Sequence, residues 1–268
     1  MNRSPAQESA LYEVDHLTRV YGAGRRRVVA LDDVNLRVHR GQRLGIVGES
    51  GSGKSTLIRL MAALDRPTSG TVRFDGREVS GLGEGRLGFL RSRVQLVFQD
   101  PRSSLNPRMR VGDIVAEPLR SHTIRHELGT IDAGRRVAEL LESVDLPADA
   151  AGRFPHEFSG GQRQRIAIAR ALAPSPDVLI ADEAVSALDV SVRAQVLNLL
   201  MGLVERLGLT MLFVSHDLAV VRHVCPDAVV LQAGRIVEAG PTPQLFSDPG
   251  HPYTARLVAA IPQFRTRT

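Results

Sequence analysis

The sequence predicts an α/β fold with a parallel sheet, and three observations lead to this prediction. Short apolar segments typical of buried strands alternate with longer segments in which apolar residues have helical spacing. A glycine-rich segment, residues 48–53, separates one such strand from one such helix. A middle stretch, about residues 100–172, has helical patterns and no clear strand. Alternating strands and helices imply parallel β-α-β units with right-handed crossovers, and the middle stretch implies a helical insertion.

The individual elements follow from apolar periodicity. Apolar–polar alternation, or a short apolar run bounded by turn residues, predicts strands at residues 31–38, 44–47, 71–74, 94–98, 178–181, 211–214 and 229–231. Helical spacing without a breaker predicts helices at residues 55–64, 111–121, 133–144, 162–172, 192–207 and 253–260. At 268 residues, a single domain is the default for this architecture.

Composition excludes several classes of protein. With 43% hydrophobic and 24% charged residues, the chain has the composition of a globular protein. No apolar run approaches the ~20 residues of a spanning helix, and the polar residues 1–8 resemble no secretion signal. The single cysteine, Cys225, excludes an internal disulfide and a Cys-rich metal site, which favours a reducing cytoplasm. The net charge of +5 could serve nucleic acid or an anionic membrane face, but a solvated basic surface is the simpler interpretation.

The strongest motif is a phosphate-binding loop. The P-loop pattern is matched in full by Gly48, Glu49, Ser50, Gly51, Ser52, Gly53, Lys54 and Ser55. Its glycines let backbone N–H groups turn toward phosphate oxygens, and the following helix adds the positive end of its dipole. Lys54, the only lysine of the chain, would contact the β- and γ-phosphates, while the Ser55 hydroxyl would face Mg²⁺ and Thr56 would extend the phosphate-binding segment. A ligand-free Gly/Ser turn is the alternative, which the strand before and the helix after disfavour.

A second element lies at the end of another expected strand. Asp182 and Glu183 follow the apolar residues 178–181, and ligands of open α/β sheets bind at the carboxyl ends of strands. We expect Asp182 to hold the Mg²⁺ shell and Glu183 to act as general base on the attacking water. The pattern alone could be a strand that ends in a solvated turn, but beside a P-loop it indicates ATP hydrolysis.

A third motif indicates a dimer. Ser159, Gly160, Gly161 and Gln162 follow Phe158 and begin a helix in which Ser159 is a good N-cap, which makes a second anion site. One triphosphate rarely needs two such sites from one chain, so we expect the P-loop of one subunit and this segment of another to close on the same ATP. Here the sequence resembles the ATP-binding-cassette (ABC) family, whose signature reads Leu-Ser-Gly-Gly-Gln, with Phe158 as a conservative replacement.

The resemblance covers about residues 11–262 and implies roles for further residues. Gln99 resembles the Q-loop glutamine, which reaches Mg²⁺ and the attacking water. Asp189, the last residue of the segment Ser-Ala-Leu-Asp, resembles the D-loop aspartate at the dimer interface. His216 resembles the switch histidine that contacts the γ-phosphate, and Tyr21 lies where the family places an aromatic on adenine. Each residue alone could be an ordinary loop or core residue, but their order along the chain favours the family.

The resemblance also implies the architecture. It is that of the ABC ATPase fold: a P-loop NTPase (RecA-like) core with a parallel sheet, an antiparallel β subdomain and a helical insertion. The ATP-binding domain would span residues 8–245, with its helical subdomain at about 100–172. Residues 246–268 would form a C-terminal tail typical of peptide-importer motors.

Two segments narrow the resemblance to one group of importers. Residues 99–108, Gln-Asp-Pro-Arg-Ser-Ser-Leu-Asn-Pro-Arg, and residues 251–254, His-Pro-Tyr-Thr, resemble motors that import oligopeptides, dipeptides or nickel. Ala184 and Val185 stand where the family commonly has Pro-Thr, a variant that the nickel branch tends to show. The implied function is coupling of ATP hydrolysis to uptake of peptides, or of nickel or another chelated metal.

The implied partners follow from this function. They are two membrane permease subunits, a second identical or similar ATP-binding subunit and an extracellular solute-binding protein, with the chain at the cytoplasmic face of the cell membrane. One alternative is an accessory soluble ABC ATPase in a multi-enzyme complex. Another is an ATPase acting on DNA, but such proteins usually insert long coiled coils or zinc hooks, so no nucleic acid is expected. An exporter motor is disfavoured by the importer-like tail, while the solute and the pairing of motors stay open.

Overall fold

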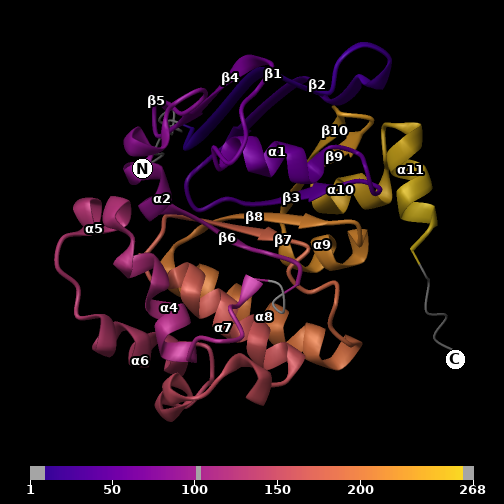
Figure 1. The fold of residues 1–268 in the computed structure, drawn as a ribbon. Coiled ribbons are helices and arrows are strands. Elements are labelled where there is room, and N and C mark those ends of the chain that lie inside the picture. Colours follow the sequence, from indigo (N-terminus) through magenta and orange to yellow (C-terminus); the bar gives the residue numbers. More distant parts are fainter. Residues whose placement is uncertain (1–9, 101–103, 262–268) are drawn as a thin grey trace, which may run out of the picture.

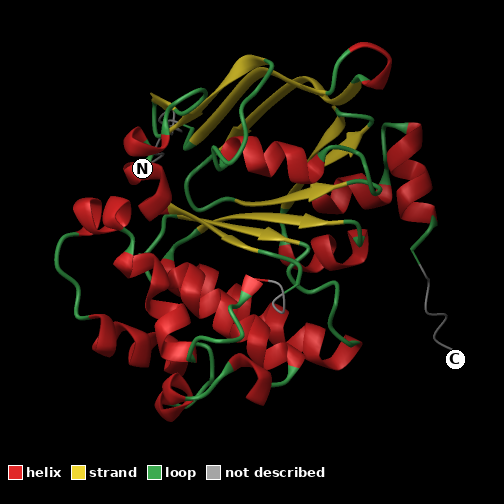
Figure 2. Cartoon of the chain, viewed as in Figure 1, coloured by secondary structure: helices red, strands yellow, loops and turns green. Residues whose placement is uncertain are grey.

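The computed structural model describes residues 10–100 and 104–261, which form two sheets and a layer of helices (Figures 1 and 2). Part of the importer-like segment after Gln99, residues 101–103, lies outside the described residues, as do both chain ends. Within the described ranges, no helix combines the length and apolarity needed to cross a bilayer.

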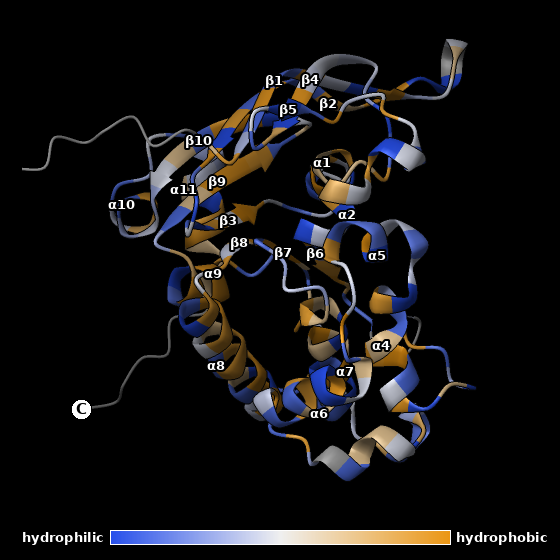
Figure 3. Cartoon of the chain, turned by 90° about the vertical axis from the view of Figure 1, so that its left-hand side faces the viewer, coloured by the Kyte–Doolittle hydropathy of each residue, from blue (hydrophilic) through white to orange (hydrophobic). Residues whose placement is uncertain are grey.

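The larger sheet is the parallel sheet that the sequence predicts. Its strands lie in the order β10-β9-β3-β8-β7-β6, and all neighbours pair in parallel except β10 with β9. The bounds are β3 Arg43–Val47, β6 Val94–Val97, β7 Val178–Asp182, β8 Thr210–Ser215, β9 Asp227–Gln232 and β10 Arg235–Pro241. The register pairs Val47 with Ser215 and Asp182 with Val214, so neighbouring strands end at one edge. Figure 3 shows hydrophobic residues concentrated on β3 and β9.

The smaller sheet confirms the antiparallel β subdomain. It has the order β2-β1-β4-β5, with β1 Tyr12–Tyr21, β2 Val28–Val38, β4 Ser69–Phe74 and β5 Arg77–Glu78. Helix α1, Lys54–Met61, lies between this sheet and the larger one (Figure 1). Its buried residues Leu57 and Ile58 belong to an apolar cluster that includes residues of both sheets. This packing fixes the start of α1 against the strand that precedes it.

The opposite face of the larger sheet is covered by helices. They are α4 Val111–Arg120, α6 Ala133–Ser143, α7 Gly160–Leu172 and α8 Val190–Leu207, while α5 His122–Leu128 lies at the side of this layer, against α4 and α2. Shorter helices flank the sheet: α2 Gly88–Arg93, α9 Leu218–Val224, α10 Thr242–Ser247 and α11 Pro252–Ala259. Leaving residues 101–103 aside, the middle stretch from 100 to 172 has helices and no strand. The predicted helical character of this stretch is therefore confirmed.

The predicted element types are confirmed, with differences at their ends. The first helix ends at Met61 and not at residue 64, because Ala63 takes a left-handed φ of 50° and the Leu64 N–H donates to the Arg59 carbonyl. The strand predicted to reach residue 98 ends at Val97. Strands β1, β5 and β10 and helices α2, α5, α9 and α10 have no counterpart among the elements expected from periodicity.

Candidate functional site

Part of the predicted site comes together at one edge of the larger sheet. The P-loop follows β3, Gln99 follows β6, Asp182 ends β7, and His216 follows β8. The parallel pairing of these strands brings their carboxyl ends side by side. Residues that lie far apart in the sequence therefore line a single edge, as expected for an open α/β sheet.

The P-loop has a shape that only glycine allows at two positions. Gly53, the N-cap of α1, has a φ of 108°, and a Cβ there would lie 2.5 Å from the Ala30 carbonyl oxygen. A Cβ on Gly48 would lie 2.3 Å from the Leu231 carbonyl oxygen. Among the described residues, no side chain caps α1. The first N–H groups of this helix can therefore bind an anion.

Lys54 is buried within this loop. Its side chain is 5% exposed, and Nζ donates to the carbonyl oxygens of Gly48 at 2.7 Å and Glu49 at 2.8 Å. Burial lowers the pKa of Lys54, while the nearby carboxylates of Glu183 and Asp182 act in the opposite direction. The ammonium group is thus held next to two acidic side chains, where an anionic ligand would stabilise its charge.

Asp182 is a carboxylate in an unfavourable environment. Burial raises its pKa, and the charge of Glu183 adds to this effect, while Lys54 and a hydrogen bond with Ser55 oppose it. Its Oδ1 atom is buried and has no hydrogen-bond partner within the described part of the chain. A buried unpaired carboxylate oxygen is costly in a protein, so this atom fits a cation that the site would bind.

Glu183 and His216 form a pair beside Asp182. The His216 Nδ1 atom lies 3.2 Å from Glu183 Oε1, and the two side chains are 55% and 21% exposed, respectively. The backbone of Glu183 has a left-handed φ of 48°, and its N–H donates to the Val214 carbonyl on the neighbouring strand. This turn directs the carboxylate toward the histidine. Both side chains stay accessible to a ligand or water.

The start of α7 has a different construction. Ser159 is its N-cap: the hydroxyl accepts from the Gln162 N–H at 3.3 Å, and the Gln162 side chain accepts from the Ser159 N–H at 2.9 Å. The predicted N-cap is therefore confirmed. Gly161 packs closely on Val192 of α8, because a Cβ there would lie 2.3 Å from Val192 Cγ1. Ser159, Gly160 and Gln162 are exposed, so this helix start faces outward.

The remaining predicted site residues differ in their contacts and in their exposure. Asp189 caps α8, because its Oδ1 accepts from the Val192 N–H at 3.0 Å. Tyr21 donates its hydroxyl to Asp65 at 2.7 Å, and the Arg19 guanidinium lies 4.4 Å from its ring centroid. One ring face of Tyr21 is therefore covered, and only the other could take a base. Gln99, Glu49, Ser50, Gly51 and Ser55 are exposed, Ser52 is buried, and Thr56 is half-buried.

One contact at the site was not predicted from the sequence. The Glu49 N–H donates to the hydroxyl of Tyr253 in α11 at 2.9 Å. The His-Pro-Tyr-Thr segment is visible in the sequence, but the two residues are 204 positions apart. No local spacing connects them, so only the fold reveals the contact.

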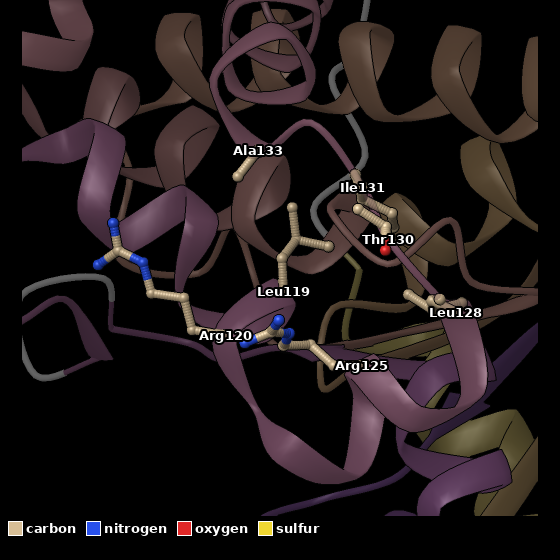
Figure 4. Close-up of a pocket in the computed structure, with 8 residues that line it drawn as sticks. Leu119, Arg120, Arg125, Leu128, Thr130, Ile131 and Ala133 are labelled. Carbon is tan, nitrogen blue, oxygen red and sulfur yellow. The ribbon is translucent and has the colours of Figure 1, made fainter.

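A separate hollow lies in the helical layer. It has a volume of about 200 Å³ and is formed by the end of α4, by α5 and by the start of α6 (Figure 4). Its lining comprises Leu119, Arg120, Arg125, Leu128, Gly129, Thr130, Ile131 and Ala133. None of the predicted site residues is among them, so this hollow is distinct from the sheet edge.

Comparison with protein families and with curated proteins gives a consistent result. The family model described as "ABC transporter" matches residues 31–186. A protein of Brucella abortus (strain 2308) named "Putative peptide import ATP-binding protein" is 49% identical over 265 residues, which cover 96% of this chain and 78% of the relative. A protein of the same description from Brucella ovis is 48% identical over 255 residues, with coverage of 95% and 80%.

Solved structures with the same fold include two relevant proteins. One is the ATP-binding cassette MJ0796, a dimer in a post-hydrolysis state bound to ADP and phosphate. It is 32% identical, has a TM-score of 0.74, and the match covers 86% of this chain and 98% of that chain. The other is cbiO1 from Clostridium perfringens, part of the ABC transporter complex cbiONQ, with 28% identity, a TM-score of 0.77 and coverage of 90% and 92%.

Proposed function

Because the chain belongs to the ABC transporter family and is an ATP-binding cassette with ATPase activity, we propose that it is the motor subunit of a peptide importer. The observation that carries this proposal is the similarity, over 96% of the chain, to a relative whose name specifies peptide import. The gathering of the P-loop, Asp182, Glu183 and His216 at one sheet edge supports the ATPase role of this site.

ATP would bind with its phosphates on the P-loop. Lys54 would contact the β- and γ-phosphates, and the N–H groups of the loop and of the first turn of α1 would bind phosphate oxygens. This is supported by the buried position of Lys54 and by the helix start that lacks a side-chain cap among the described residues. The open face of Tyr21 would take the adenine, while its hydroxyl stays on Asp65.

The residues present fit a Mg²⁺ ion on the bound nucleotide. Ser55 and Asp182 would supply oxygen ligands, Gln99 would add an amide oxygen, and the unpaired Asp182 Oδ1 atom would gain a partner. Mg²⁺ usually takes only one or two protein carboxylates together with substrate phosphates and water. When bound, the ion would neutralise charge on the β- and γ-phosphates.

Hydrolysis would use the pair at the end of β7. Glu183 would accept a proton from the attacking water as the water oxygen bonds to the γ-phosphorus and the bond to the ADP oxygen breaks. His216, 3.2 Å from the Glu183 carboxylate, would orient that carboxylate and contact the γ-phosphate. The exposure of His216 and the partial exposure of Glu183 support this role, because a water molecule can reach both groups.

The second half of each ATP site would come from a partner motor. The helix start of Ser159, Gly160, Gly161 and Gln162 exposes all of these residues except Gly161 and has no lysine of its own, and Asp189, which follows Leu188 beside Gly160, is also exposed. Two motors, identical or similar, would enclose two ATP molecules between P-loops and these helix starts. ATP would favour the closed dimer because only that state contacts the nucleotide from both sides.

Transport would require further chains. The helices of residues 100–172 would dock two membrane permeases, and an extracellular solute-binding protein would deliver the solute, with this chain at the cytoplasmic face of the membrane. The names of the relatives support peptides over nickel or another chelated metal. They also support transport over an accessory role in a multi-enzyme or nucleic-acid complex.

The test is a capture experiment with a Glu183→Gln variant. The variant should bind ATP but hydrolyse it slowly, which would hold the assembled complex in the closed state. Tagged protein would be expressed in its native cell, ATP added, the membranes solubilised and the captured chains identified. Two permeases, with or without a second similar ATPase, would support the proposal. Uptake of labelled peptide by cells lacking the gene should fall.

Two controls make this outcome decisive. Lys54→Ala should capture fewer partners than Glu183→Gln if assembly depends on bound ATP. Normal ATP turnover by Glu183→Gln would overturn the assignment of the general base. Recovery of metabolic enzymes or DNA without permeases would overturn the transport role and leave the ATPase activity in place.

A further inference from the structure

The tail helix α11 reaches the P-loop through a single buried tyrosine. Tyr253 is 3% exposed, and its hydroxyl oxygen accepts the Glu49 N–H at 2.9 Å. Local residues fix the start of α11. Pro252 is in its first turn, and His251 Nδ1 accepts the Tyr253 N–H at 3.2 Å. The capped start of α11 therefore positions the Tyr253 ring against the P-loop.

The backbone N–H and the backbone carbonyl of Glu49 both form hydrogen bonds, and each has a different partner. Its N–H donates outward to Tyr253, while its carbonyl accepts inward from Lys54 Nζ at 2.8 Å. Glu49 therefore links the tail helix directly to the lysine that is proposed to bind phosphate. A change at the Tyr253 hydroxyl would reach Lys54 through only one residue.

The tail helix is itself anchored on the larger sheet. The Glu238 carboxylate of β10 accepts the Gly250 N–H at 2.8 Å and the His251 N–H at 3.1 Å. These bonds hold the residues immediately before α11. The position of Tyr253 is thus set by the sheet whose β3 strand leads into the P-loop.

The same helix also borders the loop that carries His216. A hollow of about 270 Å³ is lined by Leu257, Ala260 and Ile261 on the tail side and by Gly48, His216 and Leu218 on the site side. The tail therefore faces both loops that are proposed to contact the γ-phosphate. A helix placed in this way can influence the geometry of both.

We propose that Tyr253 is a positioning residue of the P-loop and that the C-terminal tail helix thereby raises the affinity for ATP. This inference rests on the proposed role of the P-loop as the ATP-phosphate site. A loop that is held before the ligand arrives loses less conformational freedom on binding, which favours the complex. Tyr253 does not touch the nucleotide in this proposal, and acts through Glu49 and Lys54.

The test compares two tyrosine-to-phenylalanine variants of the full chain. Tyr253→Phe removes the acceptor and keeps the ring. Tyr12→Phe is the matched control, because Tyr12 is fully buried and its hydroxyl donates to the Met61 carbonyl at 3.1 Å, at the other end of α1. ATP affinity would be measured by calorimetry, and amide exchange of the P-loop peptide by mass spectrometry.

We expect Tyr253→Phe to raise the Kd for ATP by about 2- to 10-fold, the range that corresponds to one hydrogen bond. P-loop exchange should become faster, and Tyr12→Phe should change neither quantity. Glu238→Gln, which weakens the anchor of α11, should raise the Kd in the same direction by a smaller factor. A Tyr253→Phe variant with the Kd of the original chain would overturn the inference, and so would an equal rise for Tyr12→Phe.

A third variant separates this inference from the assignment of the ATP site. Lys54→Ala should lose most ATP affinity. If it does and Tyr253→Phe has no effect, the positioning role is wrong and the ATP site stands. If Lys54→Ala binds ATP as well as the original chain, the ATP-site assignment itself is wrong, and the positioning role is wrong with it.

Discussion

Two helix starts in this molecule match glycine-rich motifs, yet they are built in opposite ways. Helix α1 begins at Gly53 with φ 108°, lacks a side-chain cap among the described residues, and holds the buried Lys54. Helix α7 begins with the Ser159–Gln162 capping box. Its start is exposed at Ser159, Gly160 and Gln162, and it has no lysine nearby because Lys54 is the only one in the chain. In our proposal, the first binds the phosphates of ATP within its own chain, and the second contacts the ATP of a partner.

The difference shows that helix dipole and glycine content alone do not determine how an anion site works. At α1, the free N–H groups and a buried cation converge at the end of a strand. At α7, the serine hydroxyl already accepts one N–H, and Arg163, which is close by, donates to the carbonyls of Pro155 and Phe158. We therefore expect α1 to determine ATP affinity in a single chain and α7 to determine turnover in the dimer.

The largest expected effect is that of Lys54→Ala on ATP affinity. Removing a buried charged partner of a phosphate should cost about 2–5 kcal/mol, which corresponds to a roughly 30-fold or greater rise in Kd. Calorimetric titration of the isolated chain with ATP measures this rise. A Kd within threefold of the original would contradict the proposal that the start of α1 binds the phosphates of ATP within its own chain.

Next in size is the effect of Gly160→Ala on turnover. The nearest heavy atom among the described residues to a Cβ at this position is Leu188 Cδ2 at 3.7 Å, so alanine fits without a clash. The fold should be as stable as before, while ATP turnover should fall about 10- to 100-fold, because the methyl group displaces the helix start from the nucleotide of the partner.

The control for this variant is Gly161→Ala. Its Cβ would lie 2.3 Å from Val192 Cγ1, so this change should destabilise the fold itself. Thermal unfolding would distinguish the two variants. Full turnover by a stable Gly160→Ala protein would show that the α7 start does not approach ATP.

ATP affinity should depend on pH through Lys54, the first residue of α1. Burial lowers the pKa of Lys54 from its ordinary value of 10.5. The charged form binds phosphate, so affinity is complete below the lowered pKa and falls as the pH rises through it, by up to about tenfold per pH unit. Titrations from neutral pH up to the ordinary pKa of 10.5 measure this fall.

Lys54→Arg is the control for the pH dependence. It should bind ATP more weakly, and its Kd should vary little with pH because the guanidinium group stays protonated over this range. A pH dependence of equal steepness in both proteins would assign the titration to another group.

The smallest effect concerns the cap of α7. Ser159→Ala removes the hydroxyl that accepts the Gln162 N–H and should cost about 1 kcal/mol of folding free energy. ATP affinity of the isolated chain should be unchanged, since α7 does not form the pocket of its own subunit in our proposal. Urea unfolding and ATP titration measure the two quantities. A marked loss of affinity would mean that α7 acts on the ATP of its own chain.

The five parallel strands β3, β6, β7, β8 and β9 could be predicted because each is a short apolar run with clear ends. Strand β1 could not, because its alternation is interrupted by register shifts between Val14 and Val20. Helix α5 was missed since only one of its residues, Ile124, is buried, which leaves no apolar stripe to detect. Local patterns therefore reveal elements that bury one regular face, and they miss elements stabilised mainly by tertiary contacts.

The candidate site also has some residues that local patterns reveal and others that depend on tertiary contacts. Lys54 and Asp182 could be identified because each lies next to the strand or helix that positions it. The cap that Asp189 provides to α8 is also local, whereas its expected place at the dimer interface comes only from the family resemblance. The contact between Tyr253 and Glu49 depends on the packing of α11 against the sheet edge, which no sequence spacing encodes.

The left-handed backbone of Glu183 has a consequence for how this chain can evolve. A φ of 48° at a residue other than glycine costs about 1–2 kcal/mol, and glycine would remove that cost. Selection for heat resistance alone would therefore favour loss of the residue that we propose as general base. Directed-evolution experiments on this protein would need to select for activity at every round, because at this position a more stable sequence is a less competent one.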